Sequence, residues 1–112
     1  MVDDLEHELF RVELQAAESR DRLLLAGEIN LDAASQVREA ALAALAAGRA
    51  VEVDWRDAGY VSAGALQVLL ALRTALEARR QVLHLAGDNA GVRRTLELAG
   101  LSRLFPTQEA PG

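Results

Sequence analysis

Two kinds of apolar pattern alternate along the chain, and this alternation constrains the fold more than any other feature. In four short segments apolar residues recur at every second position or form short runs, which is typical of β-strands. These segments are 9–14, 22–26, 50–55 and 82–86. In three other segments apolar residues recur every three or four positions, which is typical of amphipathic helices. These segments are 34–45, 64–79 and 90–99. The predicted order of elements is therefore ββαβαβα.

This order predicts an α/β fold. Strands that alternate with helices pair in parallel and are joined by right-handed crossovers. The first two strands are separated only by a polar turn at 17–21, so we expect them to form a hairpin. The prediction is a mainly parallel four-stranded sheet with an antiparallel N-terminal edge strand and helices packed on it.

The length of 112 residues allows one hydrophobic core and leaves no room for a second. We expect a polar lead-in at 1–8, a single domain at 9–105 and a loose tail at 106–112. Within the domain, Leu101, Leu104 and Phe105 are expected to pack back as a short final turn or helix.

Polar residues and glycines mark the expected helix ends. We predict a loop at 27–30 and turns at 56–60 and 87–89, before the three helices. The candidate N-caps are Asn30 or Asp32 for the first helix and Asp88 or Asn89 for the last. Gly48 and Gly100 are the expected C-caps.

Ser62 is the residue at which the third predicted strand gives way to the leucine-rich helix 64–79. A serine hydroxyl at this point can cap the helix by accepting a hydrogen bond from a backbone N–H two or three residues later. Helix N-termini also attract anions, because free N–H groups and the helix dipole point outward there. The sequence leaves both interpretations open: a structural cap, or a hydroxyl placed to carry a phosphate.

Charge and composition exclude several classes of protein. A net charge of −5 and only four aromatic residues, Phe10, Trp55, Tyr60 and Phe105, are unlike a nucleic-acid-binding surface. The chain has no cysteine, so disulfides and thiolate chemistry are excluded. The acidic N-terminus lacks the pattern of a secretory signal, and no apolar run reaches membrane-spanning length. We therefore expect a cytoplasmic protein.

No constellation of catalytic residues is visible, so we predict that the protein is not an enzyme and has no cofactor or metal. His7 and His84 have no partner at a ligand spacing. Asp54 and Asp57 near Ser62 can in principle hold a cation, but carboxylates at a strand end are more often simply solvated.

Three segments resemble motifs of the STAS domain family. The strand 51–55 is followed by Val-Ser-Ala-Gly at 61–64, which opens the leucine-rich helix. The segment 92–101 (VRRTLELAGL) resembles the family's closing pattern v-x-x-x-L-x-x-x-G-L, and Gly27-Glu28-Ile29-Asn30 resembles its G-E-L-D loop. Each motif is short, but their order and spacing cover roughly residues 9 to 105.

The resemblance implies a function. STAS domains form bacterial anti-sigma factor antagonists, which are non-enzymatic proteins that bind a serine kinase acting as anti-sigma factor. In that family the serine of a D-S-x-G motif is phosphorylated, so the resemblance implies that Ser62 is the phosphoacceptor. The implied partner-binding and switch region comprises Asn30, Asp54, Val61, Ala63, Gly64 and Gln67. Two of these depart from the family, because Asn30 and Val61 stand where it has acidic residues.

Two hypotheses about function follow. The first is an anti-sigma factor antagonist, a monomer or weak dimer, whose affinity for a protein partner is switched by phosphorylation of Ser62. The alternative is a STAS subunit that needs no phosphorylation. It would be held constitutively in a lipid-transport ATP-binding-cassette complex or a chemotaxis-type signalling cluster by the broad apolar face of helix 64–79.

Overall fold

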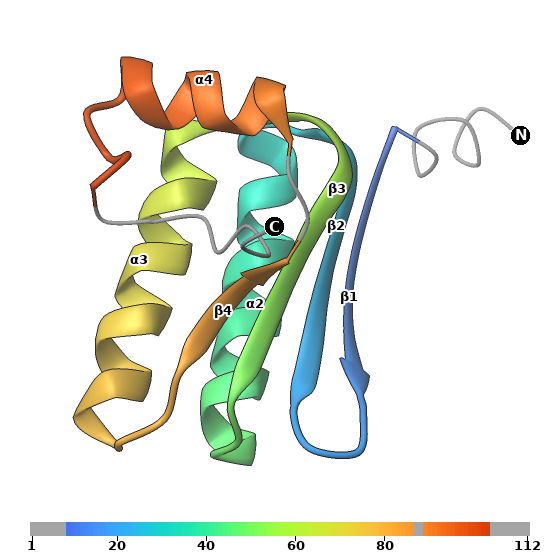
Figure 1. Ribbon diagram of the computed structural model, residues 1–112. Coiled ribbons are helices and arrows are strands. Elements are labelled where there is room, and N and C mark those ends of the chain that lie inside the picture. Colours follow the sequence, from blue (N-terminus) through green and yellow to red (C-terminus); the bar gives the residue numbers. More distant parts are fainter. Residues whose placement is uncertain (1–8, 87–88, 104–112) are drawn as a thin grey trace, which may run out of the picture.

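The computed structural model describes residues 9–86 and 89–103, which form a mixed sheet and three helices (Figure 1). The elements are β1 (Phe10–Ala16), β2 (Asp21–Ile29), α2 (Leu31–Ala47), β3 (Val51–Val61), α3 (Ala63–Ala78), β4 (Leu83–Ala86) and α4 (Ala90–Leu98). The strand order is β1-β2-β3-β4, with β1 antiparallel to β2 and the other neighbours parallel. The predicted order of elements and the mainly parallel sheet with an antiparallel edge strand are confirmed.

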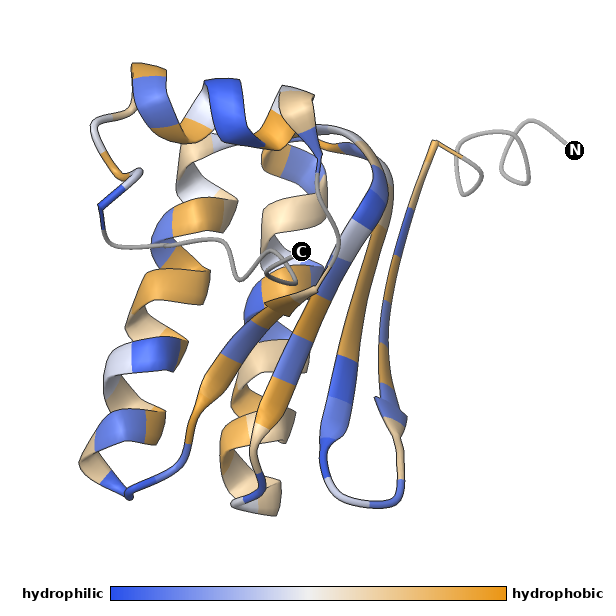
Figure 2. Cartoon of the chain, in the orientation of Figure 1, coloured by the Kyte–Doolittle hydropathy of each residue, from blue (hydrophilic) through white to orange (hydrophobic). Residues whose placement is uncertain are grey.

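Helices α2 and α3 lie side by side on one face of the sheet (Figure 1). Both connect neighbouring parallel strands in the same direction across the sheet, and right-handed crossovers then place both helices on the same side. Figure 2 shows hydrophobic and hydrophilic bands alternating along the strands. The hydrophobic side chains of the strands pack against those of the two helices. Side chains with less than 2% exposure include Leu23, Leu25 and Trp55 of the strands and Leu66 and Leu69 of α3.

The other face of the sheet carries charged side chains. Arg22 on β2 and Glu52 on β3 form an ion pair at 3.2 Å, and Arg11 and Glu13 on β1 form another at 2.7 Å. These residues alternate in sequence with the ones that face the core, as the two-residue period of a strand requires. The sheet is therefore apolar on one side and ionic on the other.

The predicted loop at 27–30 and the predicted turn at 56–60 are wrong, because both segments belong largely to strands. β2 continues to Ile29 and β3 continues to Val61, and these two residues are paired. Two register shifts make this possible, one between Leu24 and Ala26 and one between Gly27 and Glu28 of β2. At each shift β3 contributes one more residue than β2, which is the pairing of a β-bulge. The bulges break the two-residue period that marks a strand in sequence.

The helix ends agree with the predictions to within a few residues. Gly48 adopts φ 71°, and its N–H donates to the carbonyls of Ala44 and Leu45, so it is the predicted C-cap of α2. The C-cap of α4 is Ala99 rather than the predicted Gly100, which follows it with φ 72°. The predicted lead-in 1–8, the cap candidate Asp88, the packing of Leu104 and Phe105, and the tail 106–112 all lie outside the described residues.

Candidate functional site

The carboxyl ends of β2 and β3 bring two helix starts together. The backbone N–H of Ser62, which follows β3, donates a 2.8 Å hydrogen bond to the carbonyl oxygen of Ile29, the last residue of β2. Asn30 follows Ile29 directly and begins α2. Asn30 and Ser62 are therefore neighbours at the carboxyl end of the sheet, although they lie far apart in sequence.

Ser62 is the N-cap of α3. Its Oγ accepts a 3.2 Å hydrogen bond from the backbone N–H of Ala65, and its carbonyl accepts the bond from Leu66 that opens the helix. The residue has extended backbone angles and is only 4% exposed. The capping interpretation of the sequence is therefore realised in this structure, and the hydroxyl lies below the surface rather than on it.

An exposed rim surrounds Ser62. Ala63 and Gln67, one turn apart on α3, are exposed, and Gly64 is half-buried, whereas Val61 is fully buried in the core. Leu31 at the start of α2 is 77% exposed, and its Cδ2 would lie 3.8 Å from a Cβ placed on Gly64. We refer to Leu31, Ala63, Gly64 and Gln67 as the Ser62 rim. It is uncharged, and an unpaired large apolar side chain is part of it.

Leu31 was not predicted as a site residue, although the sequence carried a signal for it. It precedes the buried positions of α2, which are Ala33, Val37, Ala41 and Ala44. A leucine outside the buried stripe of its own helix has no core to join, and here it remains on the surface.

Asn30 has the same role for α2 that Ser62 has for α3. Its Oδ1 accepts a 3.1 Å hydrogen bond from the N–H of Ala33, which settles the choice between Asn30 and Asp32 in favour of Asn30. An amide in this position supplies the cap without adding a negative charge beside Ser62.

Asp54 does not lie at this carboxyl end of the sheet. It lies in the first half of β3, opposite Leu24, and is 5% exposed. Its carboxylate forms a 2.8 Å ion pair with Arg56, and the hydrogen bonds from this guanidinium hold the pKa of Asp54 below its usual value. The structure therefore brings Asn30, Val61, Ala63, Gly64 and Gln67 together around Ser62 and leaves Asp54 apart.

Asn89 fastens α4 to the same end of the sheet. Its Oδ1 caps α4 by accepting from the N–H of Val92 at 3.1 Å. Its Nδ2 donates to the carbonyl oxygens of Trp55 and Ala58 in the bulged part of β3, both at 2.7 Å. β4 pairs with β3 only as far as Asp54, and the side chain of Asn89 bonds to carbonyls of β3 beyond that point.

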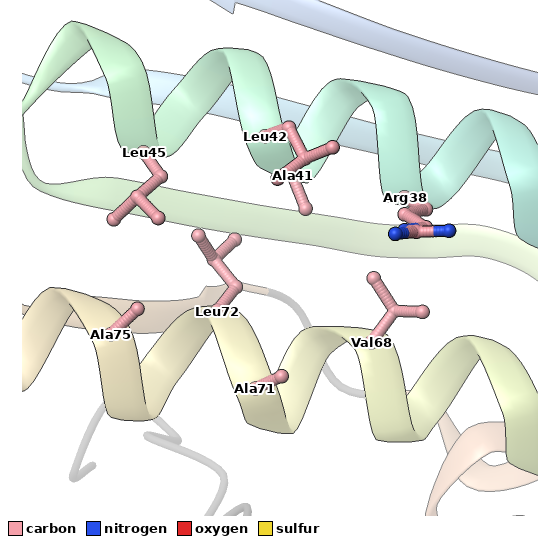
Figure 3. A pocket seen from close by; sticks show the side chains of 8 residues that line it. All are labelled: Arg38, Ala41, Leu42, Leu45, Val68, Ala71, Leu72 and Ala75. Atoms are coloured by element: carbon pink, nitrogen blue, oxygen red, sulfur yellow. The ribbon is translucent and has the colours of Figure 1, made fainter.

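A second surface feature is an apolar groove between α2 and α3, with a volume of about 280 Å³ (Figure 3). Its lining residues are Arg38, Ala41, Leu42 and Leu45 from α2 and Val68, Ala71, Leu72 and Ala75 from α3. Leu42 is 56% exposed, and Arg38 is the one charged residue among those that line the groove. The predicted broad apolar face of helix 64–79 thus covers the core on one side and reaches this groove on another.

Within residues 9–86 and 89–103, no group of three or more His, Cys, Asp or Glu side chains is placed to hold a metal ion. None of the helices in these ranges has both the length and the apolar character needed to cross a lipid bilayer.

Comparison with known proteins agrees with the fold. The family model described as "Mlab, STAS domain" matches residues 12–106. An anti-sigma factor antagonist from Mycobacterium paratuberculosis superposes with a TM-score of 0.77 at 19% identity, over 90% of this chain and 87% of its own. The anti-sigma factor antagonist SpoIIAA in its unphosphorylated form gives 0.70 at 18% identity, over 89% and 90%. The phosphorylated form of the Bacillus cell fate determinant SpoIIAA gives 0.62 at 18% identity, over 90% and 92%. None of the curated proteins matches the sequence.

Proposed function

This chain belongs to the STAS domain family, and we propose that it is a non-enzymatic cytoplasmic regulator of the anti-sigma factor antagonist type. In this proposal it binds a serine kinase that acts as an anti-sigma factor, and phosphorylation of Ser62 lowers its affinity for that partner. The similarity in fold to two anti-sigma factor antagonists supports the proposal.

The observation that carries the proposal is the position of Ser62 directly beneath an uncharged rim at the start of α3. A phosphoserine carries close to two negative charges at neutral pH. At the N-terminus of a helix such a charge is favoured by the free N–H groups and the dipole, so α3 would not unwind. The phosphate would instead change the rim, because it adds charge and bulk where a partner would meet only Leu31, Ala63, Gly64 and Gln67.

The burial of Ser62 adds a requirement to this proposal. With 4% of the residue exposed, a kinase reaches Oγ only when the first turn of α3 opens locally. Such an opening would break the bond from Ala65 to Oγ, and phosphate oxygens could then accept from the same N–H groups. SpoIIAA is known in both an unphosphorylated and a phosphorylated form, so a protein of this fold tolerates the modification.

The test combines identification of the partner with charge variants. Phosphosite mass spectrometry on the protein isolated from its own cells, with its co-purifying proteins, should find phosphate on Ser62 and a serine kinase. Binding of that purified kinase should then be weakened by Ser62→Asp and retained by Ser62→Ala. Ser35→Asp is the matched control, since Ser35 is exposed in the first turns of α2, outside the rim. Equal affinity of the Ser62→Asp and Ser62→Ala proteins would contradict the switch.

A second candidate is favoured by the groove between α2 and α3 together with the capped, buried hydroxyl of Ser62. In this alternative the protein is a constitutive subunit of a lipid-transport ATP-binding-cassette complex or a chemotaxis-type signalling cluster. Ser62 would then serve only as a helix cap, and the apolar groove would hold the partner.

The two candidates differ in which variant disrupts the complex. The constitutive subunit predicts that Val68→Asp, which puts a charge into the groove, releases the partner while Ser62→Asp has no effect beyond lower stability. Thr74→Asp is the control, because Thr74 is exposed on α3 and does not line the groove. Release by Ser62→Asp with no effect of Val68→Asp would rule out this second candidate.

A further inference from the structure

Strand β1 has an open edge. It lies at one end of the strand order, and among residues 9–86 and 89–103 no other strand pairs with its outer side (Figure 1). Its seven residues pair with β2 in one unbroken register from Phe10↔Gly27 to Ala16↔Asp21. The strand at the opposite edge of the sheet, β4, has only four residues.

The hydrogen bonds of β1 show which backbone groups face outward. The carbonyl of Leu9 accepts from the N–H of Glu28, and Ala17 donates to the carbonyl of Arg20. In an antiparallel pair, bonded and non-bonded residues alternate, so odd-numbered residues of β1 bond to β2. The N–H and C=O groups of Phe10, Val12 and Leu14 therefore point away from the sheet. They are the groups that an added strand would use.

The side chains of β1 are complementary to a second copy of the same strand. When two β1 strands pair antiparallel with Val12 opposite Val12, Phe10 lies opposite Leu14 and Arg11 lies opposite Glu13. The outward-facing residues then form the hydrogen-bonded pairs, each exchanging two bonds, and the apolar side chains pair with one another. Each Arg11 comes to lie between the Glu13 of its own chain and that of the other, so four charges alternate in sign.

Neighbouring registers lack this match. Centring the pair on Glu13 would place the two Glu13 carboxylates opposite each other, which is unfavourable. Centring it on Leu14 would place Glu13 opposite Gln15 and leave Arg11 without an acidic neighbour across the strands. Charge thus selects the register centred on Val12.

The surroundings of β1 leave room for another strand. A hollow of about 270 Å³ lies along it, lined by Phe10, Arg11, Val12 and Glu13 and by Gln36 of α2. Phe10, Val12 and Leu14 are only partly buried against the core, so a neighbouring strand would cover more of their surface. The strand contains no proline and no bulge, which are two of the features that protect edge strands from pairing.

We propose that two copies of this chain associate weakly and symmetrically through antiparallel pairing of their β1 strands, with Val12 at the two-fold axis. The result is one sheet that continues across both copies, formed by an isologous interface. This surface is separate from the Ser62 rim, because β2 lies between β1 and β3. Dimer formation and partner binding can therefore be tested independently, and failure of one does not decide the other.

Sedimentation equilibrium of the full chain over a wide concentration range is the first test, and we expect a reversible dimer. Val12→Pro should abolish it, because proline removes the outward N–H at the axis without removing a bond to β2. Val12→Ala is the matched control: it keeps that N–H and should retain the dimer in a weaker form. Circular dichroism shows whether each variant is folded. A wild-type protein that stays monomeric up to its solubility limit would overturn the proposal.

A charge-exchange experiment tests the register itself and does not depend on the proline variant. Arg11→Glu and Glu13→Arg each replace two attractive cross-strand pairs with repulsive ones, so each variant alone should dimerise about tenfold more weakly. Mixing the two variants restores opposite charges at both positions, and the mixture should form a heterodimer close to wild-type affinity. Loss of the ion pair between Arg11 and Glu13 within one chain cannot be repaired by mixing. A mixture no tighter than either variant alone would exclude this register.

Discussion

The backbone nitrogen of Ser62 and the carbonyl oxygen of Ile29 are 2.8 Å apart, so the residue that begins α3 is hydrogen-bonded to the residue that ends β2. The side chain of Ser62 is at the same time bonded to the N–H of Ala65 within α3. One residue therefore joins the sheet to the helix through two different groups. The two contributions can be separated by substitution, because only the second needs the hydroxyl.

Ser62→Ala should lower the free energy of unfolding by about 1 kcal/mol, the typical cost of losing a serine N-cap. The bond from the Ser62 N–H to Ile29 is kept in the variant, so the junction should remain in place. Urea denaturation measures the change, and Ser35→Ala is the control. Ser35 is exposed and its hydroxyl is 3.4 Å from the carbonyl of Asp32, so its loss should change stability by no more than a few tenths of a kcal/mol. Equal effects of the two substitutions would mean that the cap contributes nothing.

Asn89→Ala should cost about 2–3 kcal/mol, since it removes a helix cap and two donors to carbonyls of β3. Asn30→Ala removes only a cap of the same type and should cost about 1 kcal/mol. The difference between the two variants in denaturant unfolding therefore measures what the bonds to Trp55 and Ala58 contribute. Identical losses would show that these bonds add no stability.

Gly27→Ala should be much more harmful than Gly48→Ala, although both glycines have positive φ, at 79° and 71°. A Cβ on Gly48 meets no atom within 4 Å, so its cost is the left-handed backbone alone, about 1–2 kcal/mol. A Cβ on Gly27 would collide with the carbonyl oxygen of Leu9 and the Cα of Phe10 in β1. We expect Gly27→Ala to lower the free energy of unfolding, measured by urea denaturation, by at least twice as much as Gly48→Ala. Similar losses would mean that β1 moves aside freely.

Asp54 should make the stability of the domain sensitive to acid. Its folded-state pKa is lowered, chiefly by the hydrogen bond from Arg56, so its contribution is complete above the unfolded value of about 3.9. That contribution is lost as the pH falls through the lower folded-state pKa. Asp54→Asn should cost about 1–2 kcal/mol at pH 7, and the loss should shrink as the pH falls below about 4. Unfolding free energies of both proteins from pH 7 to pH 2 test this. A constant difference across that range would contradict it.

Local patterns in the sequence were sufficient to predict much of the fold. The element order, the parallel sheet with its antiparallel edge and the caps at Gly48 and Ser62 depend on residues close together in the chain. The bulges were not predictable, because they depend on the pairing of β3 with β2. At each of the two bulges, near Trp55 and near Gly59, β3 has one residue more than β2. The two-residue pattern of a strand breaks there, so the sequence alone predicts a turn.

In the candidate site, too, some features follow from local sequence and others depend on how distant elements pack. Ser62, Ala63, Gly64 and Gln67 lie on one helix start, so their proximity follows from helix geometry alone. The resemblance to the family groups Asp54 with them, but an extended strand carries it away from Ser62. The exposure of Leu31 follows from its place outside the buried stripe of α2. Its position beside Gly64 depends on how two helices meet, and no pattern within either helix contains that information.

The bridge from Asn89 to β3 has a consequence for the order in which the chain acquires its structure. The side chain spans 34 positions to Trp55 and 31 to Ala58, and both acceptors exist in place only once the bulged strand has formed. The nine-residue α4 is too short to be stable by itself in water. Its formation is therefore coupled to that of β3, and it should be the last helix to form and the first to exchange its amide hydrogens with solvent.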